Sequence, residues 1–354
     1  MRRTDEWRKQ RMSSDRPLEL MGAPGSPYTR KMLATLRYRR IPHRILWGGH
    51  TNPPEGYPAP KVKLLPTFYF RDEQGDVEAI VDSTPITRRL EESYAGRSVI
   101  PSDPELAFYN ELIEDYADEW LTKAMFHYRW YHEADRVNAG PLLMYWSSNT
   151  ASADDAKKMS DFFTQRQFDR LYVVGSNDVT ADTIEASYIR FLEILDALIQ
   201  QQGYVLGGRP SSADFAIYGQ LTQLGIIEPT SAKLMAERSP RVRAWLDRVE
   251  DLSGLEAKDS DWFAPEEARA ALAPLLAEIG RVYAPFLLAN AAAAQAGEAQ
   301  WEGEIDGRPW TQPTFPYQAK CLSALRAAHA DLPSNLKAPV DSALAEAGCS
   351  VLFV

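Results

Sequence analysis

Hydrophobic and polar residues alternate over residues 18–21, as along a half-buried strand, and glycine and proline then end the pattern. A helix is predicted next, because Ser26 is a favourable N-cap and Pro27 suits the first helical position. Apolar residues recur every four positions from Tyr28, and basic side chains take the other faces (Arg30, Lys31, Arg37, Arg39 and Arg40). Residues 43–47 follow as a second strand. The pattern predicts a β-α-β unit with the Ser26 hydroxyl at the positive end of a helix.

The pattern of the next residues predicts a loop over 48–63, a strand over 64–70 and a turn over 72–76. A second strand over 77–81 and a helix over 86–94 follow. The two strands are joined by a short polar turn and are therefore expected to form a hairpin. The helix is expected to have Ser83 or Thr84 as its N-cap, with Pro85 in its first turn.

From residue 103 the apolar spacing becomes helical and predicts helices over 105–130, over 181–202 and from 241 onward. Acidic side chains of the first helix are expected to form a solvated face (Glu111, Glu114, Asp115, Asp118 and Glu119). Before the third helix, Ser211 and Asp214 fit a capping box, in which each side chain accepts a hydrogen bond from the other residue's backbone N–H.

About one hundred residues follow residue 255, and their composition is too apolar for a disordered tail. The pattern predicts a helix pair over 265–300, a turn or short hairpin over 301–310 and a helix over 318–329. This extension is expected to act as a cap over an active cleft, as a dimer arm or as a closing helical layer.

Composition narrows the class of protein. The 354-residue chain is long enough for two domains, and its formal net charge of −10 argues against a nucleic acid or an anionic membrane as the main partner. No window approaches the roughly 18–20 apolar residues of a membrane span. Residues 1–16 read as a flexible polar arm without the apolar run of a signal peptide. A cytoplasmic location is therefore expected.

Neither cysteine nor histidine spacing indicates a metal site. Cys321 and Cys349 lie far apart and outside any zinc-ligand or disulfide pattern. His127 and His132 are five residues apart, so on one helix their side chains would point in different directions. No metal is expected.

Three short motifs carry a resemblance to the glutathione S-transferase family. They are Ser26-Pro27-Tyr28 at the first turn, Leu65-Pro66 before the third strand and Asp82-Ser83 before the next helix, and the capping box at Ser211 also fits. The resemblance implies that Pro66 is cis and that the Leu65 backbone pairs with the cysteinyl part of glutathione. It further implies that Asp82 and Ser83 hold the γ-glutamyl end. Arg30 and Lys63 are candidate partners for the carboxylates of glutathione.

The resemblance makes glutathione the co-substrate, and its chemistry explains why a hydroxyl would stand at the first turn. A thiol with a pKa near 8.5 is mostly protonated at pH 7, and a hydroxyl donor at a helix N-terminus favours the thiolate. Ser26 is the preferred donor, because Tyr28 is equally well explained as the first residue of the buried helix face. No cysteine occurs in the first 320 residues, which disfavours disulfide exchange or reductive deglutathionylation.

The implied fold is an α/β thioredoxin-like domain followed by an all-α domain. The expected units are the arm, a glutathione-binding domain, a helical electrophile-binding domain and the extension (1–16, 17–97, 98–254 and 255–354). In the second domain Tyr116, Trp120 and His127 are candidates for the wall of an apolar or aromatic electrophile pocket.

The implied function is a glutathione transferase, with a homodimer expected because the family usually pairs through both domains. Two alternatives stay open at this point. One is a non-catalytic glutathione-binding or protein-interaction module of the same fold. The other is a glutathione-dependent lyase or isomerase, which would use the same thiolate on a different substrate.

Overall fold

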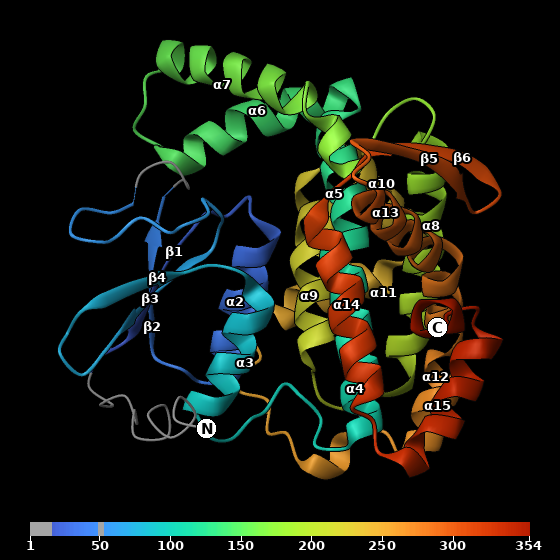
Figure 1. Cartoon of the computed structure of the whole chain (residues 1–354). Helices are drawn as coiled ribbons and strands as arrows, with labels where there is room; N and C mark the ends of the chain where they lie inside the picture. The colour runs from blue at the N-terminus through green and yellow to red at the C-terminus, as the bar shows by residue number, and fades with distance from the viewer. Residues whose placement is uncertain (1–15, 49–52) are drawn as a thin grey trace.

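The structure of the chain, a computed structural model, describes residues 16–48 and 53–354 (Figure 1). The predicted arm, apart from Arg16, and residues 49–52 of the predicted loop lie outside the described residues. Residues 53–63 of that loop contain no helix or strand.

The N-terminal domain is a four-stranded sheet with two helices packed on the side that faces the rest of the molecule (Figure 1). Its elements are β1 (Leu18–Gly22), α2 (Pro27–Tyr38), β2 (His43–Trp47), β3 (Thr67–Arg71), β4 (Val77–Ile80) and α3 (Ser83–Ser93). The strand order is β2-β1-β3-β4, with β1 parallel to β2 and the other pairs antiparallel. Leu20 lies opposite Ile45 and Phe68, and Leu20 and Phe68 are fully buried in the core under the helices. The predicted thioredoxin-like domain is confirmed.

One predicted helix start was wrong. Asp82, and not Ser83 or Thr84, is the N-cap of α3, and its carboxylate accepts a hydrogen bond from the Thr84 N–H at 3.3 Å. The helix therefore includes Ser83 and begins earlier than predicted, because an aspartate side chain caps a helix as well as a hydroxyl does.

The C-terminal domain is helical, as predicted. Its elements are α4 (Pro104–Tyr116), η1 (Ala117–Leu121), α5 (Thr122–Trp130), α6 (Glu133–Ser147), α7 (Ala153–Phe168), η2 (Leu171–Val174), α8 (Ala181–Gln202), α9 (Ser212–Thr222), η3 (Gln223–Ile227), α10 (Pro229–Arg238) and α11 (Pro240–Val249). The predicted capping box is confirmed at the start of α9, where Asp214 accepts from the Ser211 N–H at 2.8 Å and Ser211 accepts from the Asp214 N–H at 3.4 Å.

The extension forms a further layer of the helical domain. It comprises η4 (Asp259–Asp261), α12 (Pro265–Glu278), η5 (Ile279–Tyr283), α13 (Ala284–Ala296), β5 (Gln300–Ile305), β6 (Arg308–Pro313), α14 (Pro316–Ala330), α15 (Ser334–Glu346) and η6 (Ser350–Phe353). The predicted hairpin is present as β5 and β6, and its Trp310 ring lies 5.4 Å from the Trp120 ring. The predicted helix pair was wrong, because a π turn carries α12 into α13 as one continuous helix. Of the three expected roles, the closing layer describes this packing.

The continuous helix Pro265–Ala296 is long and apolar enough to pass a length and composition test for a membrane span. The prediction that no window approaches this limit was therefore wrong. Within the protein, 56% of its most apolar window is buried, and a buried core helix passes the same test.

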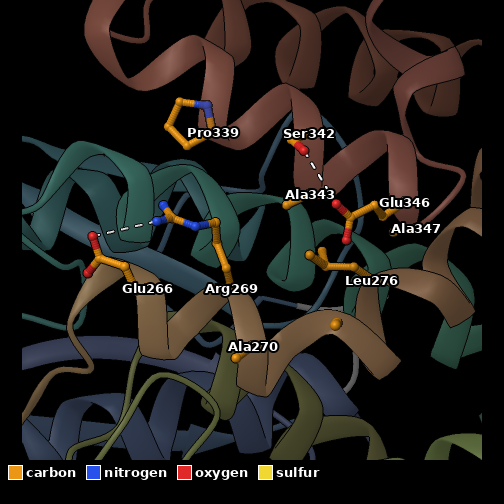
Figure 2. Close-up of a pocket in the computed structure, with 10 residues that line it drawn as sticks. Glu266, Arg269, Ala270, Leu276, Pro339, Ser342, Ala343, Glu346 and Ala347 are labelled. Carbon is orange, nitrogen blue, oxygen red and sulfur yellow. Dashed lines mark hydrogen bonds and ion pairs between the residues drawn. The ribbon is translucent and has the colours of Figure 1, made fainter.

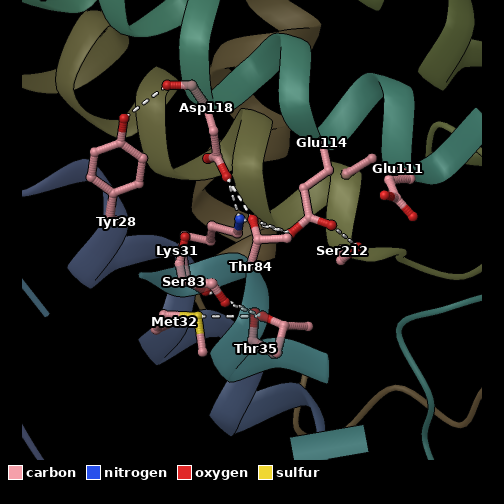
Figure 3. Close-up of polar contacts among 12 residues, drawn as sticks. Tyr28, Lys31, Met32, Thr35, Ser83, Thr84, Glu111, Glu114, Asp118 and Ser212 are labelled. Atoms are coloured by element: carbon pink, nitrogen blue, oxygen red, sulfur yellow. Dashed lines mark hydrogen bonds and ion pairs between the residues drawn. The ribbon is translucent and has the colours of Figure 1, made fainter. Parts of the chain in front are cut away.

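A buried charge network joins the two domains (Figure 3). Lys31 of α2 donates to Glu114 of α4 at 2.8 Å and to Asp118 of η1 at 2.6 Å. Lys31 and Glu114 are each 1% exposed and Asp118 is 7% exposed, so the predicted solvated face was wrong for these two carboxylates. Glu114 also accepts from Ser212 of α9 and Arg88 of α3, which satisfies its remaining oxygen.

The protonation states follow from this pairing. Burial alone would raise the pKa of Glu114, but Lys31 and Arg88 lower it to about 2. Burial raises the pKa of Asp118 to about 6 in spite of Lys31. Burial would lower the pKa of Lys31, yet the two carboxylates raise it above its ordinary value. The ammonium is therefore charged throughout the physiological range.

Replacing Lys31→Met should destabilise the protein by about 3–5 kcal/mol, because it leaves buried carboxylates without their cation. Chemical denaturation at pH 7 measures this loss. The matched control is Lys157→Met, which breaks the exposed Lys157–Asp161 pair and should change the free energy of unfolding by less than about 1 kcal/mol. Equal losses in the two variants would contradict the assigned role of Lys31.

Candidate glutathione site

The turn after β1 brings Ser26 to the chain that enters β3. Ser26 is the N-cap of α2, and its oxygen accepts from the Thr29 N–H at 3.2 Å. The same hydroxyl donates to the Leu65 carbonyl oxygen at 3.5 Å. The Leu65–Pro66 peptide bond is cis, as the resemblance implied. Ser26 and Leu65 are both half-buried, so a ligand can reach the space beside them.

Gly25 in this turn lies directly under α6. A Cβ atom at Gly25 would come within 2.8 Å of the Trp146 ring and 3.6 Å of Leu143. Glycine is therefore required for this close approach. Helices α6 and α7 extend across one end of the sheet domain, and α6 overhangs the turn that holds Ser26 (Figure 1).

Arg129 of α5 fixes the same turn from the other domain and was missed in the sequence. Its guanidinium donates to the Gly25 carbonyl at 2.8 Å, to the Gln223 side-chain oxygen at 2.6 Å and to Glu228. Arg129 and Glu228 are buried, so this ion pair is shielded from solvent. In the sequence Arg129 is one basic residue within an aromatic-rich helix. No motif or spacing in the sequence connects it with Gly25, Gln223 or Glu228.

Tyr28 points away from the turn. Its hydroxyl donates to the Asp118 carbonyl at 2.8 Å and lies 3.4 Å from the Thr122 hydroxyl, both in the helical domain. Burial, together with Glu119 and Asp118, raises the pKa of Tyr28 well above its ordinary value. In this structure the Tyr28 hydroxyl serves the interface between the domains.

Asp82 and Ser83 lie at the N-terminus of α3. Asp82 has a φ of 81°, which is unusual for a residue other than glycine, and its carboxylate is oriented by the Thr84 N–H. One oxygen of Asp82 accepts from the Tyr317 hydroxyl of α14 at 3.0 Å. The extension therefore supplies a side chain to the predicted γ-glutamyl site, which fits the expected role of a cap over the active cleft. Ser83 is buried.

The two basic residues predicted as partners for the carboxylates of glutathione differ in their surroundings. Lys63 is exposed on the loop before β3. Arg30 donates to the Pro24 carbonyl at 3.1 Å and lies 3.8 Å from Glu250, so its guanidinium is already engaged by the turn and by the helical domain.

The predicted electrophile wall does not line an open surface. Tyr116, Trp120 and His127 are each at most 1% exposed and pack inside the helical domain. The Trp120 indole donates to the Ser187 hydroxyl at 3.0 Å. Helical spacing placed these aromatic side chains on an apolar face, and that face is the core. The side chains near the Ser26 turn are instead Leu143 and Trp146 of α6.

A groove of about 620 Å³ lies elsewhere, between α12 and α15 (Figure 2). Its lining includes the charged residues Glu266, Arg269 and Glu346 together with alanine and leucine side chains. None of the residues predicted to bind glutathione lines this groove.

Two family models match the chain. The N-terminal domain of glutathione S-transferases matches residues 20–98, and the C-terminal domain of the same family matches residues 178–248. The first match includes Ser26, Leu65 and Asp82, and the second includes the capping box. Over these two segments the chain is similar to the glutathione S-transferase family.

Solved structures of this family are also similar. A glutathione S-transferase from Methylobacterium radiotolerans in complex with glutathione sulfonate is 17% identical, with a TM-score of 0.41, covering 66% of this chain and 91% of its own. A Tau class glutathione S-transferase from mango is 17% identical, with a TM-score of 0.41, and the match covers 71% of this chain and 95% of the mango protein. A glutathione transferase family member from Pseudomonas fluorescens with bound S-(propanoic acid)-glutathione is 19% identical, with a TM-score of 0.30. The match covers 66% of this chain and 93% of the Pseudomonas protein. The comparison with curated proteins found no match.

Three carboxylates lie around the start of α14, close to the candidate site. Besides Asp82 with Tyr317, Glu119 accepts from Gln318 at 3.3 Å, and Asp115 accepts from Tyr283 at 2.6 Å. Burial raises the pKa of Glu119 to about 8, with Asp115 and Asp118 adding to the effect. Burial also raises the pKa of Asp115 to about 7. Both groups are thus expected to hold a proton near neutral pH.

The contribution of Asp115 and Glu119 to the free energy of unfolding should therefore fall as the pH rises from about 5 to above 8, whereas Lys123, whose pKa burial lowers to about 7, acts in the opposite direction above pH 7. The folded state keeps protons that the unfolded state releases near pH 4–4.5, so their stabilisation is complete below that range and is lost as pH passes the raised pKa values. Thermal unfolding between pH 5 and 9 measures the slope.

Glu119→Gln should flatten this slope and raise the melting temperature at pH 8.5, because the amide carries no charge at any pH. The control Glu237→Gln alters an exposed carboxylate on α10 and should leave the slope unchanged. An identical pH profile for wild type and Glu119→Gln would contradict the raised pKa.

Proposed function

We propose that this protein is a glutathione transferase in which Ser26 stabilises the glutathione thiolate for attack on an apolar electrophile. The observation that carries the proposal is the approach of the Ser26 hydroxyl to the Leu65 carbonyl at the N-terminus of α2. Similarity to the glutathione S-transferase family supplies the co-substrate, and this geometry supplies the residues that would hold it.

The residues fit glutathione in two respects. The Leu65 carbonyl beside Ser26 accepts from the Ser26 hydroxyl, and an extended peptide would pair there in place of that contact. Asp82 offers a carboxylate, oriented by the Thr84 N–H and the Tyr317 hydroxyl, for the ammonium of a γ-glutamyl group. Glutathione supplies the thiol, and this chain supplies a hydroxyl donor and the positive end of a helix dipole, which both favour the anion.

The electrophile is proposed to lie beside the contact between the Ser26 turn and α6. Leu143 and Trp146 offer an aliphatic and an aromatic surface there, which suits an apolar substrate. Arg129 would act as a positioning residue. Its hydrogen bond to the Gly25 carbonyl attaches the turn to the helical domain and so fixes the position of the turn relative to α6.

A non-catalytic module of the same fold is the alternative that one observation favours. Asp82, the proposed γ-glutamyl anchor, already accepts a hydrogen bond from Tyr317. If that contact is permanent, the extension occupies the anchor and glutathione does not bind. A glutathione-dependent lyase or isomerase would share Ser26 and differ only in its substrate.

Titration with reduced glutathione and with an S-alkyl glutathione separates the transferase from a module that does not bind glutathione. We expect both to bind, with the S-alkyl form tighter because its apolar group contacts α6. Tyr317→Phe should tighten binding by about 2–10-fold, since glutathione no longer competes with a hydrogen bond to Asp82. Asp82→Asn should weaken it. Absence of binding at millimolar glutathione in wild type and in Tyr317→Phe would favour the non-catalytic module.

Ser26→Ala should lower kcat/KM with a standard aromatic electrophile by about 10²-fold, because the thiolate loses its hydroxyl donor. The pKa of bound glutathione, read from thiolate absorbance against pH, should rise in the same variant. Ser26→Thr keeps the hydroxyl and the helix cap and should restore most of the activity. If Tyr28→Phe abolishes turnover while Ser26→Ala retains it, Tyr28 is the donor and the proposal fails.

A further inference from the structure

Two histidines and a glutamate from three elements meet beside the junction of α5 and α6. His127 lies on α5, His132 is the N-cap of α6 and Glu185 lies on α8. The prediction that the two histidines point in different directions was wrong. It assumed one helix, but α5 ends at Trp130 and His132 is extended (φ −81°, ψ 136°), so its ring turns back to 5.4 Å from the His127 ring.

The ligand atoms of the three residues converge. Nε2 of His127 lies 3.2 Å and Nε2 of His132 lies 3.1 Å from the same carboxylate oxygen of Glu185. All three ligand atoms lie within 4.8 Å of one another. Bonds of about 2.0–2.1 Å in a tetrahedral zinc site separate neighbouring ligand atoms by about 3.3 Å, which the two distances from histidine to Glu185 already match.

We propose that His127, His132 and Glu185 bind a divalent transition metal ion, with zinc as the reference ion. Two imidazole nitrogens and one carboxylate suit zinc, and also cobalt, nickel or copper, better than the hard ions magnesium and calcium. A water molecule completes the four ligands, because Glu185 and His132 are 35% and 30% exposed and open the site to solvent.

The surroundings of His127 are those of an oriented ligand. Its other ring nitrogen, Nδ1, lies 2.8 Å from the Ser176 hydroxyl, which fixes the ring and leaves Nε2 directed at Glu185. The Tyr131 ring stacks on the imidazole at 4.5 Å, and the Tyr131 hydroxyl is itself held by Asp178 at 2.9 Å. His127 is fully buried, whereas the carboxylate side of the cluster faces the surface.

The ion would join the end of α5 and the start of α6 to α8. Helix α6 carries Trp146, which lies over Gly25, at its far end. Metal binding at the root of α6 therefore steadies the helix that overhangs the Ser26 turn. This inference does not depend on the proposed transferase chemistry, since the ion touches none of the residues assigned to glutathione.

The test is zinc titration of the full chain, purified without a histidine tag and stripped with a chelator. Calorimetry should give one zinc ion per chain, and zinc should raise the melting temperature. Cobalt should give the visible absorption of a tetrahedral complex with nitrogen and oxygen ligands. His132→Gln and Glu185→Gln each remove a partly exposed ligand and should weaken binding by at least about tenfold.

The matched control is His329→Gln, because His329 also pairs with a carboxylate, Asp341, at 2.7 Å but without a third ligand. Zinc affinity should be unchanged in this variant. Absence of stoichiometric binding by wild type, or equal zinc affinity in wild type, His132→Gln and Glu185→Gln, would overturn the proposal and leave a hydrogen-bonded His–Glu–His cluster. Glutathione binding is measured separately, so failure here leaves the proposed function untouched.

Discussion

The ammonium of Lys31 has no solvent to stabilise it, and this constraint sets how the two domains meet. A buried cation must lie within reach of its carboxylates, so α2 can dock only where Glu114 and Asp118 surround Lys31. Helices α2 and α9 approach each other closely at Gly219 of α9. A Cβ atom at this position would come within 2.5 Å of the Pro27 carbonyl oxygen, so glycine allows the contact. The N-terminus of α2, and with it Ser26, is thereby placed relative to the helical domain.

Local patterns predicted much of the fold and only part of the site. Alternation, caps and prolines located the sheet, its two helices, the capping box and the hairpin of the extension, because each depends on neighbours in sequence. Ser26 and Leu65 were singled out through a family resemblance, and the structure brings them together. Lys31 and Arg129 were not, because a charged residue looks the same in sequence whether its partner is water or a distant carboxylate.

The wrong predictions for the aromatic side chains and for the two histidines have a different cause. Helical spacing predicts which side chains lie on one face, but it does not tell whether that face meets solvent, ligand or another layer. In most of the described helical domain the extension or a neighbouring helix covers the face, as Trp310 covers Trp120. His127 and His132 were misjudged because a helix ended between them, and element boundaries are the least certain part of such reasoning.

The π turns have a consequence for how this sequence tolerates change. Ala117–Leu121 and Ile279–Tyr283 each interrupt a helix with a wider turn, and Gln223–Ile227 ends one in the same way. One residue corresponds to about 100° of rotation around a helix axis. A π turn holds one residue more than an α turn in about the same rotation, so the extra residue in Ala117–Leu121 widens the turn while Lys123 keeps its direction toward the Val174 carbonyl. A change of one residue within these turns is therefore absorbed more easily than the same change in the regular helices beside them.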